Sequence, residues 1–233
     1  MIIVPSLRAG WEFENTPDEI RGMTINSVGS GIGYANGKVG RAATFTSTNT
    51  GISVGDASSF NFMHQTGVFT VAGWFKLNDY TAIRYNAFAS NFNTASANTG
   101  FMFGYDNRRL NFPNVERTRN TLKLEVGKGV ANAFVSRISI IDAILNNNWN
   151  FFVFKSDGIT NKCLINNINQ TLFDNDINTP GTGNAQATAK IGNRATNDDL
   201  NLDGQLSNLR FFDKALSDSD CERLYHGLHP LNG

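Results

Sequence analysis

Oxygen-bearing side chains alternate near the C-terminal end of the sequence, at Asp199, Asn201 and Asp203, directly before Gly204. This spacing is typical of the start of a calcium-binding loop, in which oxygen ligands at alternate positions surround a hard cation. The twelfth position of such a loop carries a bidentate glutamate, whereas this sequence has Arg210 there. An ordinary strand end followed by an Asp-Gly turn accounts for the same residues. We therefore predict that the protein needs no cofactor, and we keep calcium at these three side chains as an alternative hypothesis.

Few carboxylates and histidines are spaced in a way that suits catalysis. Glu12 and Glu14 are an acidic pair on one face of a predicted strand, and retaining glycosidases need two carboxylates about 5–5.5 Å apart. The pair lies on a terminal strand, so a solvated strand face is the simpler interpretation. His226 and His229 are three residues apart, which suits a metal ion, but the end of a helix also favours histidine. We predict that the protein is not an enzyme.

Segments in which apolar and polar residues alternate recur along the chain, as expected for β-strands with one buried face. The first is the segment 7–13, with Leu7, Ala9, Trp11 and Phe13 on one face. The same alternation places three further sets on shared faces: Phe69, Val71, Phe75 and Leu77; Leu122, Leu124 and Val126; and Phe134, Ile138 and Ile140. Residues 149–155 are apolar on both faces, which is typical of a central strand between two packed layers.

Turn sequences separate these segments. Asn36-Gly37, Asp157-Gly158 and Asp203-Gly204 are dipeptides typical of β-hairpin turns. Asparagine is abundant throughout the chain, and its side chain tolerates left-handed backbone conformations and mimics backbone turns. Both features predict a protein rich in β-strands and in the loops that join them.

One helix is predicted, near the C-terminus. Ser217 is a natural N-cap, and Asp220 three residues later resembles the acidic partner of a capping box. Leu216 and Cys221 are spaced to form a hydrophobic staple across this start. Gly227 is placed to end the helix. The predicted order is therefore many strands followed by one short helix.

The composition limits the kinds of partner that the protein binds. Lys+Arg and Asp+Glu both number 20, so the net charge is zero, and Arg108-Arg109 is the one adjacent basic pair. A nucleic-acid-binding protein usually carries a basic stripe, so we expect no nucleic-acid partner. The sequence lacks an apolar run of 18 residues, so we expect no membrane span. Residues 1–5 are apolar but too short for a signal peptide, and we expect none.

The two cysteines, Cys163 and Cys221, form no CxxC motif. A structural disulfide between them is one interpretation, and two buried free thiols are the one we favour. No repeat, charged tail or linker divides the 233 residues. A chain of this length readily forms one sandwich domain.

Several segments, taken in order, resemble the laminin G-like jelly roll, a domain of the concanavalin A-like lectin and glucanase class. They are GWEFEN (10–15), GKVGRAATF (37–45), FTVAGWFKL (69–77), LINN (164–167), AKIGNR (189–194) and DGQLSNLRFFDKALSDSD (203–220). The resemblance implies an all-β jelly-roll sandwich of two antiparallel sheets, with the first and last strands adjacent. We assign residues 8–229 to this domain and residues 1–7 to an N-terminal arm.

The resemblance implies a domain that binds a ligand without catalysis, and glycans are the first class to consider. Loops rich in asparagine, aspartate and aromatic residues suit sugar hydroxyls and ring faces. The predicted ligand contacts are Tyr80, Tyr85, Asn193, Arg194 and Asp198. A polysaccharide-degrading enzyme remains an alternative, because some sandwiches of this class are glycosidases.

A structural partner is the second class to consider. The apolar arm 1–7 is suited to dock on a neighbouring subunit by strand addition, another copy of the chain included. Domains of this bare kind resemble decoration or fibre proteins of bacteriophage virions. We therefore expect a location on a virion or an extracellular surface, with glycans, structural subunits of an assembly, or both as partners. A purely structural assembly protein without glycan binding is the alternative.

Overall fold

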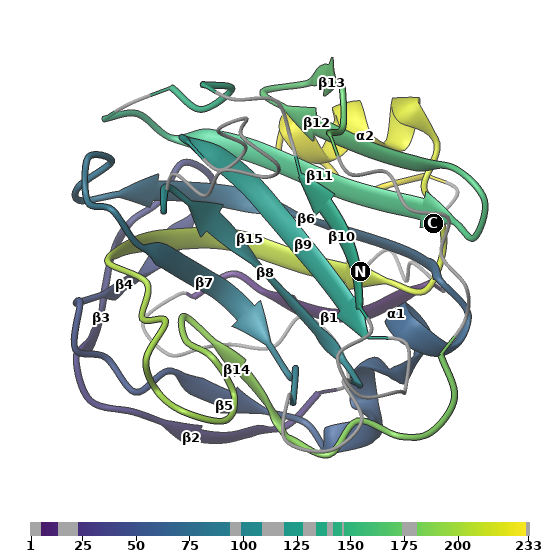
Figure 1. Cartoon of the computed structure of the whole chain (residues 1–233). Coiled ribbons are helices and arrows are strands. Elements are labelled where there is room, and N and C mark those ends of the chain that lie inside the picture. The colour runs from purple at the N-terminus through teal and green to yellow at the C-terminus, as the bar shows by residue number, and fades with distance from the viewer. Residues whose placement is uncertain are drawn as a thin grey trace.

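The computed structural model describes residues 6–13, 23–93, 99–108, 119–127, 134–138, 142–145, 147–173 and 181–231, with backbone only for 134–138. Residues 1–5 of the predicted arm, Glu14 and Ile140 lie outside these ranges. The described residues form two antiparallel sheets packed face to face (Figure 1). This arrangement confirms the expected all-β sandwich of two antiparallel sheets.

The first sheet, sheet A, contains eight of the described strands. In spatial order they are β13 (Ile168–Gln170), β12 (Asn161–Ile165), β11 (Asn150–Asp157), β6 (Val68–Leu77), β15 (Gly204–Phe212), β4 (Arg41–Phe45) and β3 (Ile32–Asn36). The eighth, β1 (Leu7–Trp11), pairs with β15. The first and last described strands are therefore adjacent, as expected.

The second sheet, sheet B, contains seven of the described strands. In spatial order they are β10 (Phe134–Ile138), β9 (Thr121–Gly127), β8 (Phe101–Asp106), β7 (Tyr85–Ser90), β14 (Ala189–Ile191), β5 (Ile52–Val54) and β2 (Ile25–Val28). In Figure 1, β7, β8 and β9 cross in front of the long strands of sheet A. We call the side of each sheet that faces the other sheet its inner face, and the opposite side its outer face.

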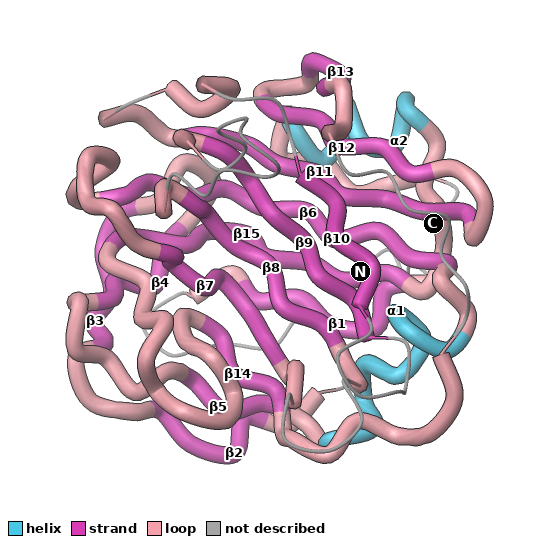
Figure 2. Tube along the Cα trace, in the orientation of Figure 1, coloured by secondary structure: helices cyan, strands magenta, loops and turns pink. Residues whose placement is uncertain are grey.

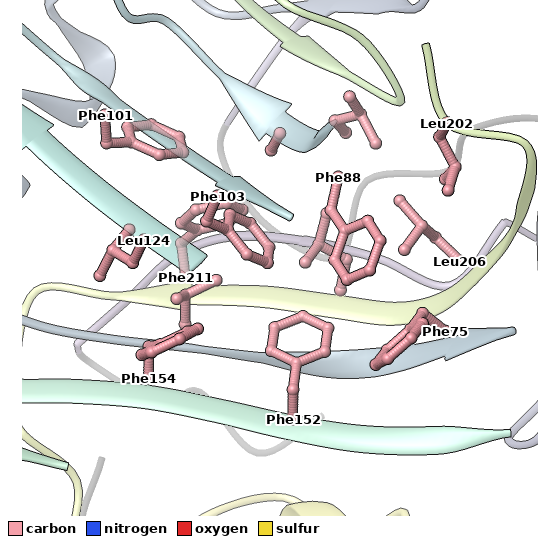
Figure 3. Packing of buried hydrophobic residues seen from close by; sticks show 14 of the residues in the cluster. Phe75, Phe88, Phe101, Phe103, Leu124, Phe152, Phe154, Leu202, Leu206 and Phe211 are labelled. Atoms are coloured by element: carbon pink, nitrogen blue, oxygen red, sulfur yellow. The ribbon is translucent and has the colours of Figure 1, made fainter. Parts of the chain in front are cut away.

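The main core lies between the inner faces and is rich in phenylalanine. Phe103 of sheet B lies 5.1 Å from Phe152 of sheet A, and Phe88 lies 4.7 Å from Phe75, between ring centroids (Figure 3). The predicted apolar faces of β6 and β9 belong to this core: Phe69, Val71, Phe75, Leu77, Leu122, Leu124 and Val126. The strand alternation predicted for both segments is confirmed.

The strand β11 is apolar on both faces, as predicted for residues 149–155. Phe152 and Phe154 point into the main core, whereas Phe151 and Val153 belong to a second apolar cluster on the outer face of sheet A. The β11 strand lies between β6 and β12. The strand is apolar on both faces because each face packs against other apolar residues of the protein.

The predicted C-terminal helix is α2 (Asp218–Tyr225), and its caps are confirmed. Ser217 Oγ accepts a hydrogen bond from the backbone N–H of Asp220. At the other end, Gly227 adopts a φ of 74°. Its N–H donates to the carbonyl of Leu224, and that of Leu228 donates to Arg223, which together form a Schellman motif.

Helical structure is also present at a place that the sequence did not indicate. Residues Ala57–Phe60 form the 3-10 turn η1, and Asn61–Gln65 form the short helix α1 (Figure 2). Phe60 and Met63 are buried in the main core. Nine residues are too few for a helical periodicity to stand out, which explains why this segment was missed.

Two of the three predicted hairpin turns are confirmed. Asn36-Gly37 leads from β3 to β4, and Asp157-Gly158 leads from β11 to β12. The third, at Asp203-Gly204, is wrong, because Gly204 starts β15 after a segment that crosses over from sheet B. A turn at Asn166 and Asn167, with φ values of 52° and 64°, joins β12 to β13. These left-handed values agree with the expected role of asparagine.

One predicted face is divided by a bulge. The pairing of β1 with β15 shifts between Leu7 and Ala9. Leu7 therefore joins the apolar cluster on the outer face of sheet A, while Ala9, Trp11 and Phe13 join the main core. The prediction that Leu7 shares their face is wrong, because a bulge reverses the side on which a residue lies.

The two cysteines are free and buried, as favoured from the sequence. Cys163 belongs to the main core, whereas Cys221 belongs to the cluster on the outer face of sheet A. The two thiols therefore lie on opposite sides of that sheet. Burial raises the pKa of Cys221 to about 11 and raises that of Cys163 further. Among the described residues, no helix is long and apolar enough to cross a bilayer.

Candidate ligand-binding face

The outer face of sheet B carries charged side chains that are almost entirely buried. Along β9, Leu122, Leu124 and Val126 point into the main core, so Lys123 and Glu125 point outward. Their side chains are only 10% and 9% exposed. Charged groups are seldom buried unless they are paired, and here the Lys123 Nζ atom forms an ion pair with Glu125 Oε1.

A second buried ion pair lies on the neighbouring strand β8. Arg108 donates from Nε to Asp106 Oδ1 at 3.0 Å and from Nη2 to Asp106 Oδ2 at 2.7 Å. This bidentate geometry is the strongest form of the contact. The Asp106 side chain is completely buried, while Arg108 keeps a third of its side chain exposed. Arg108 is therefore the accessible end of the charged cluster.

Apolar and aromatic side chains lie beside these ion pairs. Tyr85, Ala87, Phe92 and Met102 form a separate buried cluster on this side of β7 and β8. The Tyr85 hydroxyl donates to the backbone carbonyl of Lys123 at 3.2 Å. The Arg108 guanidinium lies 5.2 Å from the centre of the Tyr85 ring, within the range of a cation–π contact.

The Tyr85 phenol is held in its neutral form. Burial raises its pKa well above the ordinary value, and the carboxylates of Glu125 and Asp106 raise it further. A neutral phenol keeps its proton as a hydrogen-bond donor. The face therefore combines ammonium, guanidinium and phenol donors with two carboxylate acceptors.

A loop that contains most of the predicted ligand contacts borders this face. Residues 192–203 lead from β14 in sheet B to β15 in sheet A. The Leu200 side chain packs against the cluster of Tyr85 and Met102, and its carbonyl accepts a hydrogen bond from the Ala87 N–H at 2.9 Å. We call residues 192–203 the rim loop.

Within the rim loop, three predicted contacts lie close together. Asn193 Nδ2 donates to the Asn49 carbonyl at 2.9 Å and to Asp198 Oδ1 at 3.3 Å. Asp198 also forms an ion pair with Lys190, and Arg194 pairs with Asp199 at 2.5 Å. Asn193 is buried, whereas Asp198 is exposed. The structure thus brings Asn193, Arg194 and Asp198 together at the edge of the face on which Tyr85 lies.

Tyr80 lies elsewhere, in the segment that follows β6. Its ring is 5% exposed and packs edge-on against Tyr105 in the main core. Its hydroxyl accepts from the Leu77 N–H and donates to the Asn148 carbonyl at 2.9 Å. The ring of Tyr80 packs in the core and its hydroxyl bonds to backbone groups of two segments. This placement argues against a contact with a ligand.

The three residues of the calcium hypothesis face three different partners. Asp199 pairs with Arg194, and the Asn201 amide donates to the Asn49 carbonyl at 2.5 Å. Asp203 accepts from Arg84 Nη2 at 2.8 Å and from Asn78 at 2.7 Å. In the part of the chain that the structure describes, no three acidic, histidine or cysteine residues gather as metal ligands. Calcium binding stays a hypothesis that this geometry does not support.

Two of the residues considered for catalysis, Glu12 and His229, contact Arg210 of β15. Glu12 accepts a hydrogen bond from Arg210 Nη2 at 3.2 Å, and Arg210 Nη1 lies 3.0 Å from His229 Nδ1. His226 is the C-cap of α2, at the position where a helix end favours histidine. These contacts fix the two ends of the described chain against β15.

The sequence analysis missed the four charged residues of the outer face of sheet B. Lys123 and Glu125 alternate with leucines in TLKLEVG, a pattern that also fits an ordinary solvated strand face. Asp106 and Arg108 follow an apolar strand and resemble a turn. The signal that was available is the pair of opposite charges at alternate positions of one strand. Its burial depends on contacts that only the folded chain provides.

Comparison with known proteins shows the fold. No protein-family model matches the chain, and no curated protein matches it by sequence. Domain 4 of AbnA, a GH43 extracellular arabinanase from Geobacillus stearothermophilus solved in complex with arabinotriose, superposes with a TM-score of 0.60 and 18% identity. That match covers 92% of this chain and 95% of the arabinanase domain.

Two bacterial toxin domains are similar as well. The receptor-binding domain of botulinum neurotoxin C/D mosaic serotype has a TM-score of 0.68 at 12% identity, covering 97% of this chain and 52% of the toxin domain. The binding domain of Paraclostridial Mosquitocidal Protein 1 has a TM-score of 0.66 at 16% identity, covering 95% and 52%. The chain thus spans about half the length of these toxin domains. The laminin G-like family and a virion origin stay predictions.

Proposed function

We propose that the chain is a non-catalytic glycan-binding domain, and that its ligand contacts the outer face of sheet B and the rim loop. The observation that carries this proposal is the buried Lys123–Glu125 ion pair beside Tyr85. Buried ion pairs add little to stability, because desolvation offsets their attraction. Their concentration on one outer face, beside aromatic and apolar side chains, is typical of a binding site.

The chemistry of the face suits a sugar. Sugar hydroxyls both donate and accept hydrogen bonds, so they match a face where Arg108 and the exposed edge of Lys123 donate and the exposed edge of Glu125 accepts. The structural similarity to an arabinanase domain in complex with arabinotriose supports the same class of ligand.

The positions of the two carboxylates support binding without catalysis. Asp106 pairs with Thr121, whereas Glu125 pairs with Met102, four residues along the same ladder. Four residues of strand separate the backbone positions by about 13 Å, whereas a retaining glycosidase needs its two carboxyl groups about 5–5.5 Å apart. Each carboxylate is also neutralised by its own cation.

A glycan array followed by calorimetry tests this function. We expect binding to oligosaccharides of the array, with arabinotriose as the first defined ligand to titrate. Arg108→Gln removes an accessible charged donor, and we expect the affinity to fall about tenfold. Lys76→Gln is the matched control, because Lys76 lies on β6 of the other sheet, and its affinity should equal that of the wild type. An array without any hit, or equal losses in both variants, would contradict the proposal.

The biological setting that we propose is a decoration, fibre or adhesion protein on a virion or cell surface. Its support is the sequence: the resemblance to such domains and the apolar residues 1–5, which lie outside the described residues. Deletion of residues 1–6 should abolish assembly with the structural partner without unfolding the domain, and glycan binding should be unchanged. Assembly that survives the deletion would refute a role for the arm.

A further inference from the structure

A buried guanidinium on the outer face of sheet A contacts the segment 228–231, which follows α2. Leu209 and Phe211 of β15 point into the main core, so Arg210 between them points outward. Its side chain is only 2% exposed. A buried guanidinium needs hydrogen-bond acceptors for its donors, and one of these acceptors comes from the segment.

Three side chains surround the Arg210 guanidinium. Nε donates to Asn208 Oδ1 at 2.7 Å, and Nη2 donates to Glu12 Oε1 at 3.2 Å. Nη1 lies 3.0 Å from His229 Nδ1. Because arginine has donors only, His229 Nδ1 is the acceptor in this contact and the imidazole proton is on Nε2. Histidine is also the side chain that changes its charge near neutral pH.

Backbone groups of the segment are bound to α2. The Leu228 N–H donates to the Arg223 carbonyl at 2.8 Å, and Arg223 Nε donates to the His229 carbonyl at 2.7 Å. The Leu231 N–H donates to Asp220 Oδ1 at 2.8 Å. The His229 imidazole forms a different link, because it joins the segment to β15 of sheet A.

Protonation of His229 is incompatible with its contact with Arg210. The added proton occupies Nδ1, which then has no lone pair to accept with, and two cations face each other. Burial lowers the pKa of His229 below 6.5, Arg210 and Arg223 lower it further, and Glu12 acts in the opposite direction. Asp220 faces the backbone of the segment instead. The stability that this contact contributes is therefore present above pH 6.5 and is lost as the pH falls through the lowered pKa.

We propose that His229 is a pH-sensitive switch, which holds the segment 228–231 against sheet A when neutral and releases it when protonated. After release, Arg210 keeps Asn208 and Glu12 as acceptors, so its charge stays paired and the sandwich stays folded. The switch acts on the outer face of sheet A and is independent of the glycan-binding proposal.

Backbone ¹⁵N relaxation of the whole chain at two pH values tests the switch. One is pH 7.5, and the other lies below the midpoint of the His229 titration, as read from its ring resonances. The order parameters of residues 228, 229 and 231 should fall from about 0.85 to below about 0.6 at the lower pH, while those of β15 stay constant. His229→Asn keeps an acceptor but does not titrate, so its segment should stay ordered at both pH values. His226→Asn makes the same change at the exposed C-cap of α2 and should behave like the wild type.

Any of three results would overturn the proposal. The wild-type segment stays ordered although the His229 ring has become protonated, His229→Asn shows the same fall in order parameters as the wild type, or His226→Asn abolishes that fall. The order parameters of β15 distinguish local release from acid unfolding of the whole domain. The wild-type measurement alone decides the question if a variant fails to fold.

Discussion

The outer face of sheet A is mainly apolar and also carries the paired cations Lys155 and Arg210, whereas charged residues form a larger part of the outer face of sheet B. On sheet A, the outer face carries Trp74, Phe151 and Val153, and α2 covers them with Cys221 and Leu224. On sheet B, the outer face carries two ion pairs and the neutral phenol of Tyr85. Figure 1 shows α2 at the top of the view, on the far side of sheet A from sheet B.

We propose that this difference separates stability from recognition. An apolar face covered by a helix stabilises the fold through buried area. A face of buried charges contributes little net stability, and we propose that the ion pairs of sheet B serve a ligand. The two strands differ in their outward positions, which are Phe151, Val153 and Lys155 in β11 but Lys123 and Glu125 in β9.

The largest expected effect is on the outer face of sheet A. Trp74 is almost fully buried and stacks on Tyr225 of α2, with 5.3 Å between ring centroids. Trp74→Ala should lower the free energy of unfolding by about 3–5 kcal/mol, the usual cost of truncating a buried aromatic side chain. Urea denaturation measures this change. Glycan affinity of the folded variant should match the wild type, and a specific loss of affinity would break the contrast between the faces.

A smaller change in stability, with a large change in binding, is expected on the outer face of sheet B. The double variant Lys123→Met and Glu125→Leu replaces a buried ion pair with apolar residues. Such replacements are neutral or stabilise proteins by about 1–4 kcal/mol, whereas glycan affinity should fall more than tenfold. Calorimetry and urea denaturation measure the two quantities. A strongly destabilised variant would show that the pair serves the fold.

A modest effect is expected at the start of α2, which covers sheet A. Ser217→Ala removes the N-cap bond to Asp220 and should lower the free energy of unfolding by about 1 kcal/mol. Ser58→Ala is the control, because Ser58 is exposed and lies in η1, away from α2. Thermal denaturation of both variants checks the difference. Equal melting temperatures would show that α2 contributes less to the stability of the fold than its contacts with sheet A indicate.

The smallest effect appears only below neutral pH, at α1. Burial lowers the pKa of His64 from 6.5, partly offset by its bond to the Gly183 carbonyl. In the unfolded chain this histidine binds a proton near pH 6.5, but in the folded chain it does so only at lower pH. Stability should therefore be retained above pH 6.5 and fall as the pH drops through the lowered pKa. His64→Gln should flatten this slope of unfolding free energy against pH, and an unchanged slope would be contrary evidence.

Much of the fold could be predicted from the sequence, because its strands follow simple alternation. The inward sets of β6 and β9, the double-sided β11 and the capped helix α2 were all visible as local patterns. The features that were not predicted depend on contacts between residues that are far apart in the sequence. The bulge that moves Leu7 to the outer face is set by the pairing of β1 with β15, and α1 is too short to show a period.

The candidate site could be predicted only in part. Three of the predicted contacts, Asn193, Arg194 and Asp198, are close together in sequence and therefore lie on one loop, although the sequence did not indicate that they form a group. The ion pairs of sheet B involve two strands whose register places Met102 opposite Glu125. No sequence pattern predicts that register. Tyr80 was selected for its residue type alone, and its burial among loop carbonyls follows from the fold.

The most direct test of the account is to map the glycan on the folded domain by amide and methyl NMR. A saturating oligosaccharide chosen from the array should shift residues 102–108, 121–127 and 198–203 most strongly, with the Met102 methyl group as a probe next to Glu125. The resonances of α2 and of Trp74 should remain in place. Shifts confined to the outer face of sheet A, with those of β8 and β9 unchanged, would contradict the assignment of recognition to sheet B.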